Sequence, residues 1–130
     1  MRVEAGSSPV ATIPAAVGDE VHLHFRHSIY GSQVEEHFRV ARDGFQRVRL
    51  RYAERRLVEF YGHEAARREE GWWVVEGDRR ELSLLRLRVS PESGIELSLG
   101  SGRIPLWELV EPAGLVHLGV MSCEGRDDAR

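Results

Sequence analysis

The sequence predicts an all-β fold, either an antiparallel β-sandwich or a partly open β-barrel of about nine or ten short strands. Apolar and polar residues alternate over short runs, which is typical of strands with one buried face. Clusters of Gly, Pro, Asp and Ser interrupt these runs about every ten residues. The chain has 130 residues, of which 42% are hydrophobic and 30% are charged. This size and composition indicate a single domain with one modest core.

The clearest alternation predicts an antiparallel hairpin over residues 21–41. Every second residue from Val21 to His27 shares one strand face, and every second residue from Val34 to Val40 shares the matching face. All of these residues are apolar except His27 and Glu36. We expect the loop between the two strands to contain Gly31.

The same alternation predicts the remaining strands. They are expected over residues 45–52, 57–61, 72–75, 85–89, 95–99, 104–110 and 115–120. The segment 64–70 is the one helical candidate, but it is short and has no apolar stripe, so a loop with at most one turn is expected. We expect residues 1–130 to form one domain with flexible N-terminal residues and a disordered tail from about residue 122.

The composition argues against several classes of protein. A formal net charge of -3 gives no field that would attract nucleic acid. Cys123 is the single cysteine and cannot form an intramolecular disulfide. No apolar run approaches the roughly 20 residues that span a bilayer, and Met1-Arg2-Val3-Glu4 lacks the apolar stretch of a signal peptide. The sequence therefore predicts neither a nucleic-acid partner nor a membrane span.

Two polar residues, His27 and Glu36, lie on the predicted inner face of the hairpin. With a tight loop around Gly31, Glu36 would pair with Phe25, and His27 and Glu36 would become diagonal neighbours. A buried carboxylate is costly unless it is partnered, so we expect a direct or water-bridged hydrogen bond between them. Two interpretations stay open: a structural pair that sets the strand register, or a binding or catalytic pair.

The outer face of the same hairpin carries three histidines. The expected register places His24 beside His37, which is the start of a possible metal site. Zinc needs further ligands, and the nearest ones, His22 and Glu35, have charged partners of their own in this register. We therefore predict no tightly bound transition metal and no cofactor.

Other chemical templates find little support. Ser28 follows His27, but adjacent strand residues face opposite sides, and no G-x-S-x-G motif exposes its hydroxyl group. No catalytic residue is assigned. Arginines recur at alternate positions in 47–51 and in 86–88, where they suit either anion binding or a solvated outer face.

Four segments carry a resemblance to a known family. They are Phe25-Arg26-His27-Ser28, Val34-Glu35-Glu36, Trp72-Trp73-Val74-Val75 and Leu84-Leu85-Arg86-Leu87-Arg88-Val89. The chain resembles the bacterial proteins grouped as domain of unknown function 1850, and the His-Ser and Val-x-Glu elements are the specific part. The resemblance implies that His27, Ser28 and Glu36 belong to a characteristic binding or structural site.

The chain departs from the family at one turn. Family members have a Gly-Ala-Gly type turn after the third or fourth strand, where this chain has Tyr61-Gly62-His63-Glu64. Gly62 carries over and joins the predicted site, whereas His63 and Glu64 receive no role.

The resemblance also implies a cellular setting. Family members typically begin with a hydrophobic leader and are encoded beside the membrane subunits of TAXI-type TRAP transporters. The missing leader would fit a processed or truncated chain. We expect a non-enzymatic extracytoplasmic module, periplasmic or at the cell surface, that binds a small-molecule or anionic ligand. A TRAP transporter membrane or solute-binding subunit is the expected partner.

Two other function classes stay open. One is a small hydrolase-like or metal-dependent enzyme that uses His27 and Glu36. The other is a purely structural interaction domain. An enzyme requires polar groups that converge in a concave pocket, whereas an accessory module requires an open groove or an apolar patch.

Overall fold

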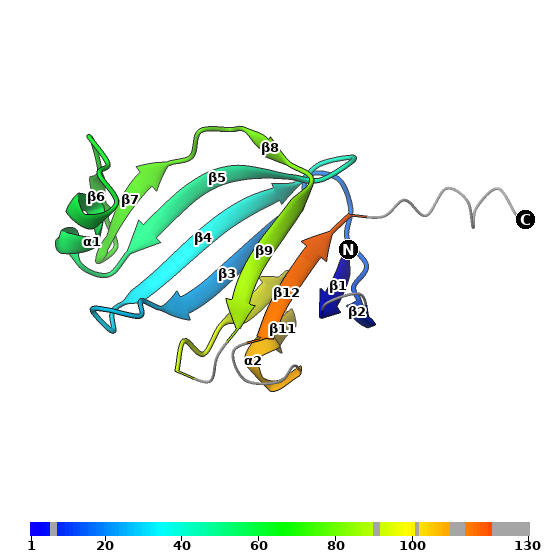
Figure 1. The fold of residues 1–130 in the computed structure, drawn as a ribbon. Helices are drawn as coiled ribbons and strands as arrows, with labels where there is room; N and C mark the ends of the chain where they lie inside the picture. The colour runs from blue at the N-terminus through cyan, green and yellow to red at the C-terminus, as the bar shows by residue number, and fades with distance from the viewer. Residues whose placement is uncertain (6–7, 90–91, 101, 110–113, 121–130) are drawn as a thin grey trace, which may run out of the picture.

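β-strands dominate the computed structural model, which describes residues 1–5, 8–89, 92–100, 102–109 and 114–120. They form two antiparallel sheets that pack together without closing into a barrel (Figure 1). This confirms the predicted all-β sandwich. The tail expected from about residue 122 lies outside the described residues. No helix in the described part of the chain is long and apolar enough to cross a membrane.

The larger sheet has the order β11-β10-β3-β4-β5-β7-β6, and β8 pairs with β5. Its strands are β3 (Glu20–Arg26), β4 (Gln33–Val40), β5 (Phe45–Tyr52), β6 (Arg67–Glu69), β7 (Trp72–Glu76), β8 (Glu81–Leu82), β10 (Glu96–Leu99) and β11 (Gly102–Pro105). The smaller sheet has the order β2-β1-β12-β9. Its strands are β2 (Ser8–Thr12), β1 (Arg2–Ala5), β12 (Gly114–Gly119) and β9 (Leu84–Val89). Two short helices complete the fold, α1 (Arg55–Phe60) and α2 (Leu106–Leu109).

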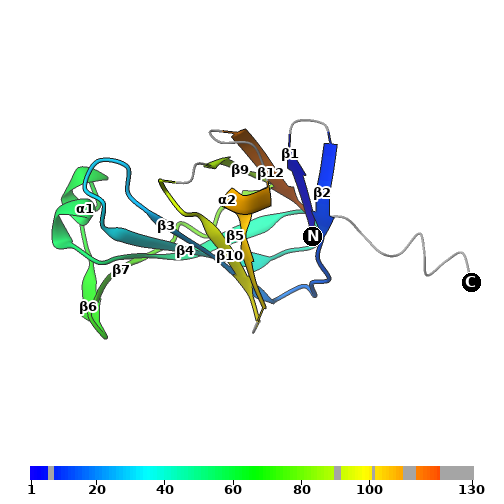
Figure 2. The same cartoon turned by 90° about the horizontal axis from the view of Figure 1, so that it is seen from below.

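The smaller sheet covers only one end of the larger sheet (Figures 1 and 2). The main apolar core lies between the two sheets and includes Val3, Leu23, Phe45 and Leu118. A second apolar cluster lies at the other end, where α1 packs against the larger sheet. The two clusters cover the two ends of the inner face. Polar residues on the part of the inner face between them can therefore reach solvent.

The β3–β4 hairpin is confirmed, but its register differs from the predicted one. Glu36 pairs with Leu23 instead of Phe25, and Phe25 pairs with Val34. The predicted register is wrong by two residues because the loop spans residues 27–32, closed by a hydrogen bond from the His27 amide to the Ser32 carbonyl. Gly31 lies in this loop with φ of 70°. A shift of two residues keeps each side chain on its predicted face.

A β-bulge in the β4–β5 ladder changes which arginines face inward. The register shifts between His37 and Phe38, so that Phe38 pairs with Arg47 and His37 pairs with Arg49. Arg47 therefore lies on the inner face beside Phe38, whereas Arg49 and Arg51 stay on the outer face. The prediction of one outer arginine row over residues 47–51 is wrong for Arg47.

Four segments differ from the predicted secondary structure. The predicted strand 57–61 is largely helix α1, and the predicted strand 104–110 divides into the end of β11 and helix α2. The segment 64–70 contains strand β6. The N-terminal residues, which we expected to be flexible, form β1 and β2. Short apolar runs suit both a strand and a single buried helical turn, so periodicity alone does not separate them.

Candidate functional site

A pocket opens on the inner face of the larger sheet, between the two apolar clusters. We call it the Glu36 pocket, and its volume is about 270 Å³. Strands β3, β4 and β5 and the turn after α1 supply its lining, which consists of Phe25, Val34, Glu36, Arg47, Leu50, Tyr52, Tyr61 and His63. Apolar walls therefore surround a small set of polar groups, which is the usual composition of a ligand site.

Glu36 is half-buried in this pocket, and the described part of the protein supplies no direct partner for its carboxylate. Among the described residues it makes no hydrogen bond and no ion pair; its interactions are the longer-range ones with Arg47, Tyr52 and Tyr61. Burial raises the pKa of the Glu36 carboxyl group above its ordinary value of 4.5, and the Arg47 charge opposes this only in part. A group from outside the chain would satisfy this carboxylate.

Arg47 is near Glu36 but does not bind it. Its guanidinium lies 5.8 Å from the centre of the Phe38 ring, and Nη1 is 3.8 Å from a carboxylate oxygen of Asp78. Its Nε is buried and has no hydrogen-bond partner within the part of the chain that the structure describes. The positive charge of Arg47 therefore favours the ionised form of Glu36 without forming an ion pair with it.

Aromatic side chains form one wall of the pocket. The rings of Tyr52 and Tyr61 stack with 5.6 Å between centroids, and the Tyr52 hydroxyl lies 2.8 Å from His63 Nε2. Burial raises the pKa of both tyrosines, with a further contribution from Glu36, and burial lowers the pKa of His63. All three groups are therefore neutral near pH 7.

The turn after α1 positions His63 in this wall. The His63 amide donates to the Val58 carbonyl (3.1 Å) and the Gly62 amide donates to the Glu59 carbonyl (3.0 Å), which is the Schellman pattern of a helix C-terminus. Gly62 has φ of 72°, the left-handed conformation that this motif requires. Gly62, predicted as a site residue, has this conformational role. Glu64 lines a neighbouring open hollow of about 630 Å³ that His63 shares.

His27 lies behind the aromatic wall. It is buried, as predicted, and its Nδ1 accepts hydrogen bonds from the Ile29 and Tyr30 amides, both at 3.2 Å. Its ring packs edge-on against Phe60 and Tyr61. The predicted direct hydrogen bond to Glu36 is absent from the described residues, because the longer loop directs His27 to its own backbone. Ser28 is exposed in the same loop.

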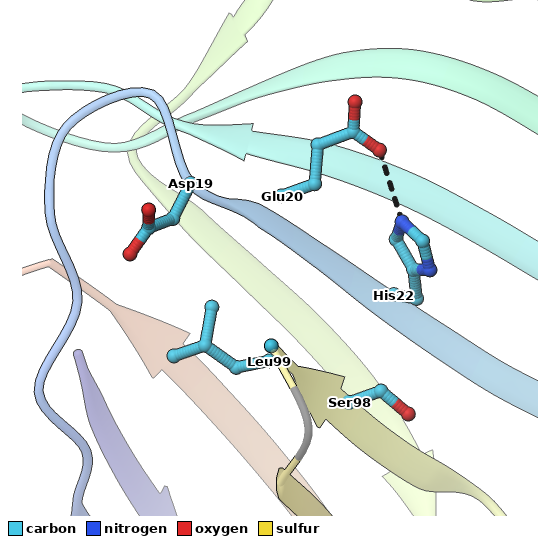
Figure 3. A pocket seen from close by; sticks show the side chains of 6 residues that line it. Asp19, Glu20, His22, Ser98 and Leu99 are labelled. Carbon is cyan, nitrogen blue, oxygen red and sulfur yellow. Dashed lines mark hydrogen bonds and ion pairs between the residues drawn. The ribbon is translucent and has the colours of Figure 1, made fainter.

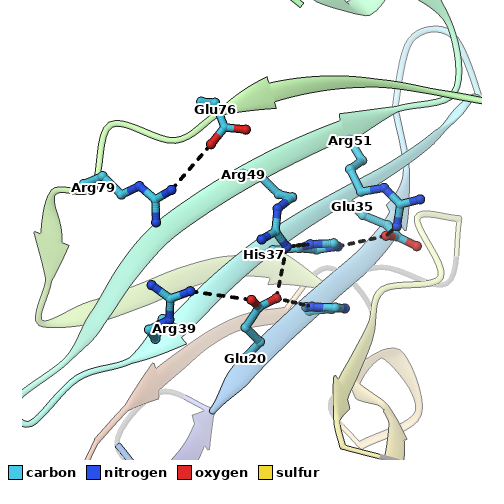
Figure 4. Close-up of polar contacts among 9 residues, drawn as sticks. Glu20, Glu35, His37, Arg39, Arg49, Arg51, Glu76 and Arg79 are labelled. Carbon is cyan, nitrogen blue, oxygen red and sulfur yellow. Dashed lines mark hydrogen bonds and ion pairs between the residues drawn. The ribbon is translucent and has the colours of Figure 1, made fainter. Parts of the chain in front are cut away.

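The outer face of the larger sheet carries a network of charges (Figure 4). His22, and not His24, pairs with His37, and the two imidazole rings stack with 3.5 Å between centroids. Glu20 accepts from His22 at 2.9 Å and from Arg49 at 3.0 Å. These interactions lower the pKa of Glu20 to about 2. The network links strands β3, β4 and β5 across their exposed side.

The network brings three potential metal ligands together. Donor atoms of Glu20, His22 and His37 lie within 4.8 Å of one another. However, Arg49 donates to Nδ1 of His37 at 2.8 Å, and Nε2 of His37 is 3.0 Å from Glu35, so both ring nitrogens are occupied. The rings are also nearly parallel, at 9°, and their lone pairs cannot converge on one ion. We conclude that this cluster is a self-paired ionic network.

A second hollow, of about 530 Å³, lies beside β3 and β10 (Figure 3). Its polar groups are already partnered: Asp19 accepts from the Ala16 amide at 2.8 Å, and Glu20 accepts from His22. In contrast to the Glu36 pocket, this hollow presents no carboxylate that lacks a partner in the protein.

Comparison with known proteins assigns a family. Residues 21–106 match the family described as Domain of unknown function (DUF1850). The chain belongs to this family. The DUF1850 region runs from β3 to the first residue of α2 and contains the whole lining of the Glu36 pocket. No curated protein and no solved structure matches the chain.

Sequence reasoning identified Glu36 in this DUF1850 site but missed the four other lining residues that carry polar groups, Arg47, Tyr52, Tyr61 and His63. Tyr52 lies on the inner face of β5, and the alternation of apolar and polar residues in this strand could have predicted that position. Tyr61 and His63 flank Gly62, and a glycine that ends a short apolar run is a known sign of a helix C-terminus. The inward position of Arg47 depends on the bulge, for which the sequence carries no signal that we recognise.

Proposed function

We propose that this DUF1850 protein is a non-enzymatic binding module whose Glu36 pocket holds a small molecule. One observation carries the proposal: a carboxylate lies in an apolar pocket with no hydrogen bond or ion pair among the described residues. Leaving such a group unpartnered reduces the stability of the fold, and proteins commonly keep such groups where a ligand completes them.

The shape of the pocket supports a small ligand. Phe25, Val34 and Leu50 provide apolar walls, and the volume of about 270 Å³ is near the lower end for sites that bind small organic molecules. The enzyme alternative has less support. An enzyme based on His27 and Glu36 needs these residues to cooperate, but His27 is committed to the loop backbone.

The proposed setting is extracytoplasmic, as an accessory to a TAXI-type TRAP solute transporter. This part rests on the resemblance to proteins encoded beside such transporters. A module that binds small molecules suits a solute transport system, in which a transporter membrane or solute-binding subunit would be its partner.

Ligand binding is tested with an ¹⁵N-labelled sample and a mixture of amines, alcohols and carboxylates of low mass. We expect amide shifts at lining residues such as Glu36, Leu50 and Tyr61, and no shifts in the hollow beside Ser98. The variant Tyr61→Ala, which removes part of the wall, should weaken binding. If no compound of any class shifts the lining residues, the binding function is wrong.

The transporter association is tested separately by co-expression with the TRAP subunits and affinity capture from solubilised membranes. We expect a transporter subunit to be recovered with the tagged chain. The variant Leu57→Asp, which carries the same tag and disrupts the second apolar cluster, should recover less transporter subunit than the wild type. Failure to recover any subunit from correctly localised wild-type protein would contradict the association.

A further inference from the structure

We infer that the ligand of the Glu36 pocket is an organic ammonium: a protonated amino group carried on a compact apolar body, with Glu36 as its counter-ion. This inference rests on the proposed binding function and specifies the chemistry of that site. It follows from the charges that face the pocket, the aromatic wall and the absence of a donor for Glu36 within the described residues.

The charges that face the pocket leave Glu36 as its unmet acceptor. His63 is neutral because burial lowers its pKa, and Tyr52 and Tyr61 are neutral because burial raises theirs. Among the described lining residues Arg47 is the one cation, and its guanidinium is directed toward Phe38 and Asp78. An ionised carboxylate accepts hydrogen bonds and donates none, so its ligand must bring N–H or O–H groups.

A charged donor satisfies this site better than a neutral one. Hydrogen bonds between a cation and a carboxylate are about twice as strong as those between neutral groups. The stacked rings of Tyr52 and Tyr61 add a favourable surface for a cation, because aromatic faces carry negative potential. Phe25, Val34 and Leu50 would contact the apolar body.

An anionic ligand fits the same pocket less well. A carboxylate would face Glu36 in a site of low polarity, where repulsion between like charges is poorly screened. The Nε of Arg47 is buried, so the far end of its guanidinium group is the only cationic donor that the described lining residues offer. The polar groups therefore select for positive charge.

The test uses two sets of probes with equal bodies and different charge. The first set is 2-phenylethylamine, 2-phenylethanol and 3-phenylpropionate; the second is butylamine, butanol and butyrate. Calorimetry at pH 7 should show that the amine of at least one set binds about tenfold more tightly than its alcohol, with the carboxylate weakest.

Two variants test whether the preference for the amine over the alcohol arises in the Glu36 pocket. Glu36→Gln keeps the shape and removes the charge, and it should weaken amine binding about tenfold while leaving alcohol binding nearly unchanged. Glu35→Gln is the matched control, because Glu35 is the adjacent residue on the outer face and pairs with Arg51. It should bind the amine as the wild type does. Equal losses in both variants would overturn the inference.

The pH dependence gives an independent readout. Amines stay protonated up to about pH 9, so ammonium affinity should rise as the pH increases through the raised pKa of Glu36, and Glu36→Gln should abolish that rise. If the alcohol or the carboxylate binds as tightly as the amine and shifts the lining residues, the ammonium inference is wrong and the binding function stands. If the amines do not bind, the inference is also wrong; the binding function fails only if the wider compound mixture gives no shifts.

Discussion

His27 stabilises the β3–β4 loop, and it does so in its neutral form. Its Nδ1 accepts two backbone amide hydrogens, from Ile29 and Tyr30, and its ring supports Phe60 and Tyr61. Protonation would place a hydrogen on Nδ1 and remove this acceptor. Burial accordingly lowers the pKa of His27. The residue closes the β3–β4 loop and supports the wall of the Glu36 pocket.

We predict that His27→Ala lowers the free energy of unfolding by about 2 kcal/mol, because two amides lose their acceptor and the aromatic rings lose packing. His27→Asn, whose side-chain oxygen can accept an amide hydrogen in a turn, should lose less. Urea unfolding monitored by tryptophan fluorescence measures both. Wild-type stability in His27→Ala would contradict this role.

The same residue predicts a pH dependence with a definite sign. Because the folded-state pKa lies below the ordinary 6.5, the unfolded chain binds the proton more readily. The contribution of His27 is therefore present above pH 6.5 and is lost as the pH falls toward the folded-state pKa. His27→Ala should lack this part of the stability loss in urea series at pH 7.5 and pH 5.5.

The sequence predicts the sheet face on which each side chain lies, but it does not predict the residue to which that side chain is hydrogen-bonded. Alternation placed His27 and Glu36 on the inner face, and it stays correct when the register moves by two residues. The distance between them depends on loop length, which the Tyr30-Gly31-Ser32 segment leaves open. A direct His27–Glu36 bond was therefore expected from a register that the protein does not adopt.

The turn after α1 depends on Gly62. Its φ of 72° is unfavourable for residues with a Cβ, although a Cβ there would meet no atom within 4 Å. We predict that Gly62→Ala lowers the free energy of unfolding by about 1 kcal/mol, and that Gly62→Asn, which tolerates this conformation better, loses less. Thermal unfolding measures both.

Gly62→Ala should also weaken the contact between Tyr52 and His63, because the turn positions His63. Chemical shifts of the His63 ring report this contact. Gly102→Ala is the control, since Gly102 lies outside the positive-φ glycines and its added Cβ would have ordinary contacts. An equal effect of Gly62→Ala and Gly102→Ala would show that the left-handed conformation is not what matters.

The outer face of β3, β4 and β5 predicts a result for zinc. Because Arg49 occupies His37 and Glu20, and the two imidazoles lie parallel, we expect far less than one zinc per chain after incubation and dialysis, measured by elemental analysis. Arg49→Met, which removes the competing cation, should retain more zinc than Arg39→Met. Stoichiometric zinc in the wild type would contradict this account of the network.

Helix α1 and the β4–β5 bulge are two features that the sequence does not predict. Leu57 and Val58 are both buried, and two adjacent buried residues in a short run suit a strand buried on both faces as well as a helical turn. The bulge leaves Val48 unpaired in the β4–β5 ladder and turns Arg47 inward. Such bulges arise from the pairing of two strands and leave little trace in one of them.

The two sheets of the sandwich differ in extent, and the Glu36 pocket lies where the larger sheet is left uncovered. The smaller sheet covers one end of the larger sheet, and α1 covers the other. β1 is a central strand of the smaller sheet, between β2 and β12, and Val3 is fully buried in the main core. The N-terminal segment is therefore part of the core even though its sequence shows little regular alternation.

We predict that Val3→Ala lowers the free energy of unfolding by about 2 kcal/mol through lost apolar burial, whereas Arg2→Ala on the exposed side of β1 changes it little. Amide shifts of Glu36 and Tyr61 should be the same in both variants, because the pocket lies at the far side of the main core. Wild-type stability in Val3→Ala would contradict the placement of β1.

The fold class was predictable because alternation persists along most of the chain, and the pocket was not, because it depends on where each layer stops. Leu23 and Val34 both alternate inward, yet they enter different apolar clusters. Nothing in their local sequence indicates that Glu36 lies between two covered regions. That position is a property of the assembled sheets.

The ionisation of Glu36 shows directly whether the free protein leaves this carboxylate without a partner. Its side-chain carboxyl ¹³C shift can be followed by NMR against pH, with Glu35 as an internal reference whose pKa the His37 hydrogen bond lowers. We predict a Glu36 pKa above 4.5 in the free protein and a lower one when an amine is bound. A Glu36 pKa at or below 4.5 in the free protein would show that a partner such as Arg47 already satisfies the carboxylate, and it would contradict the account.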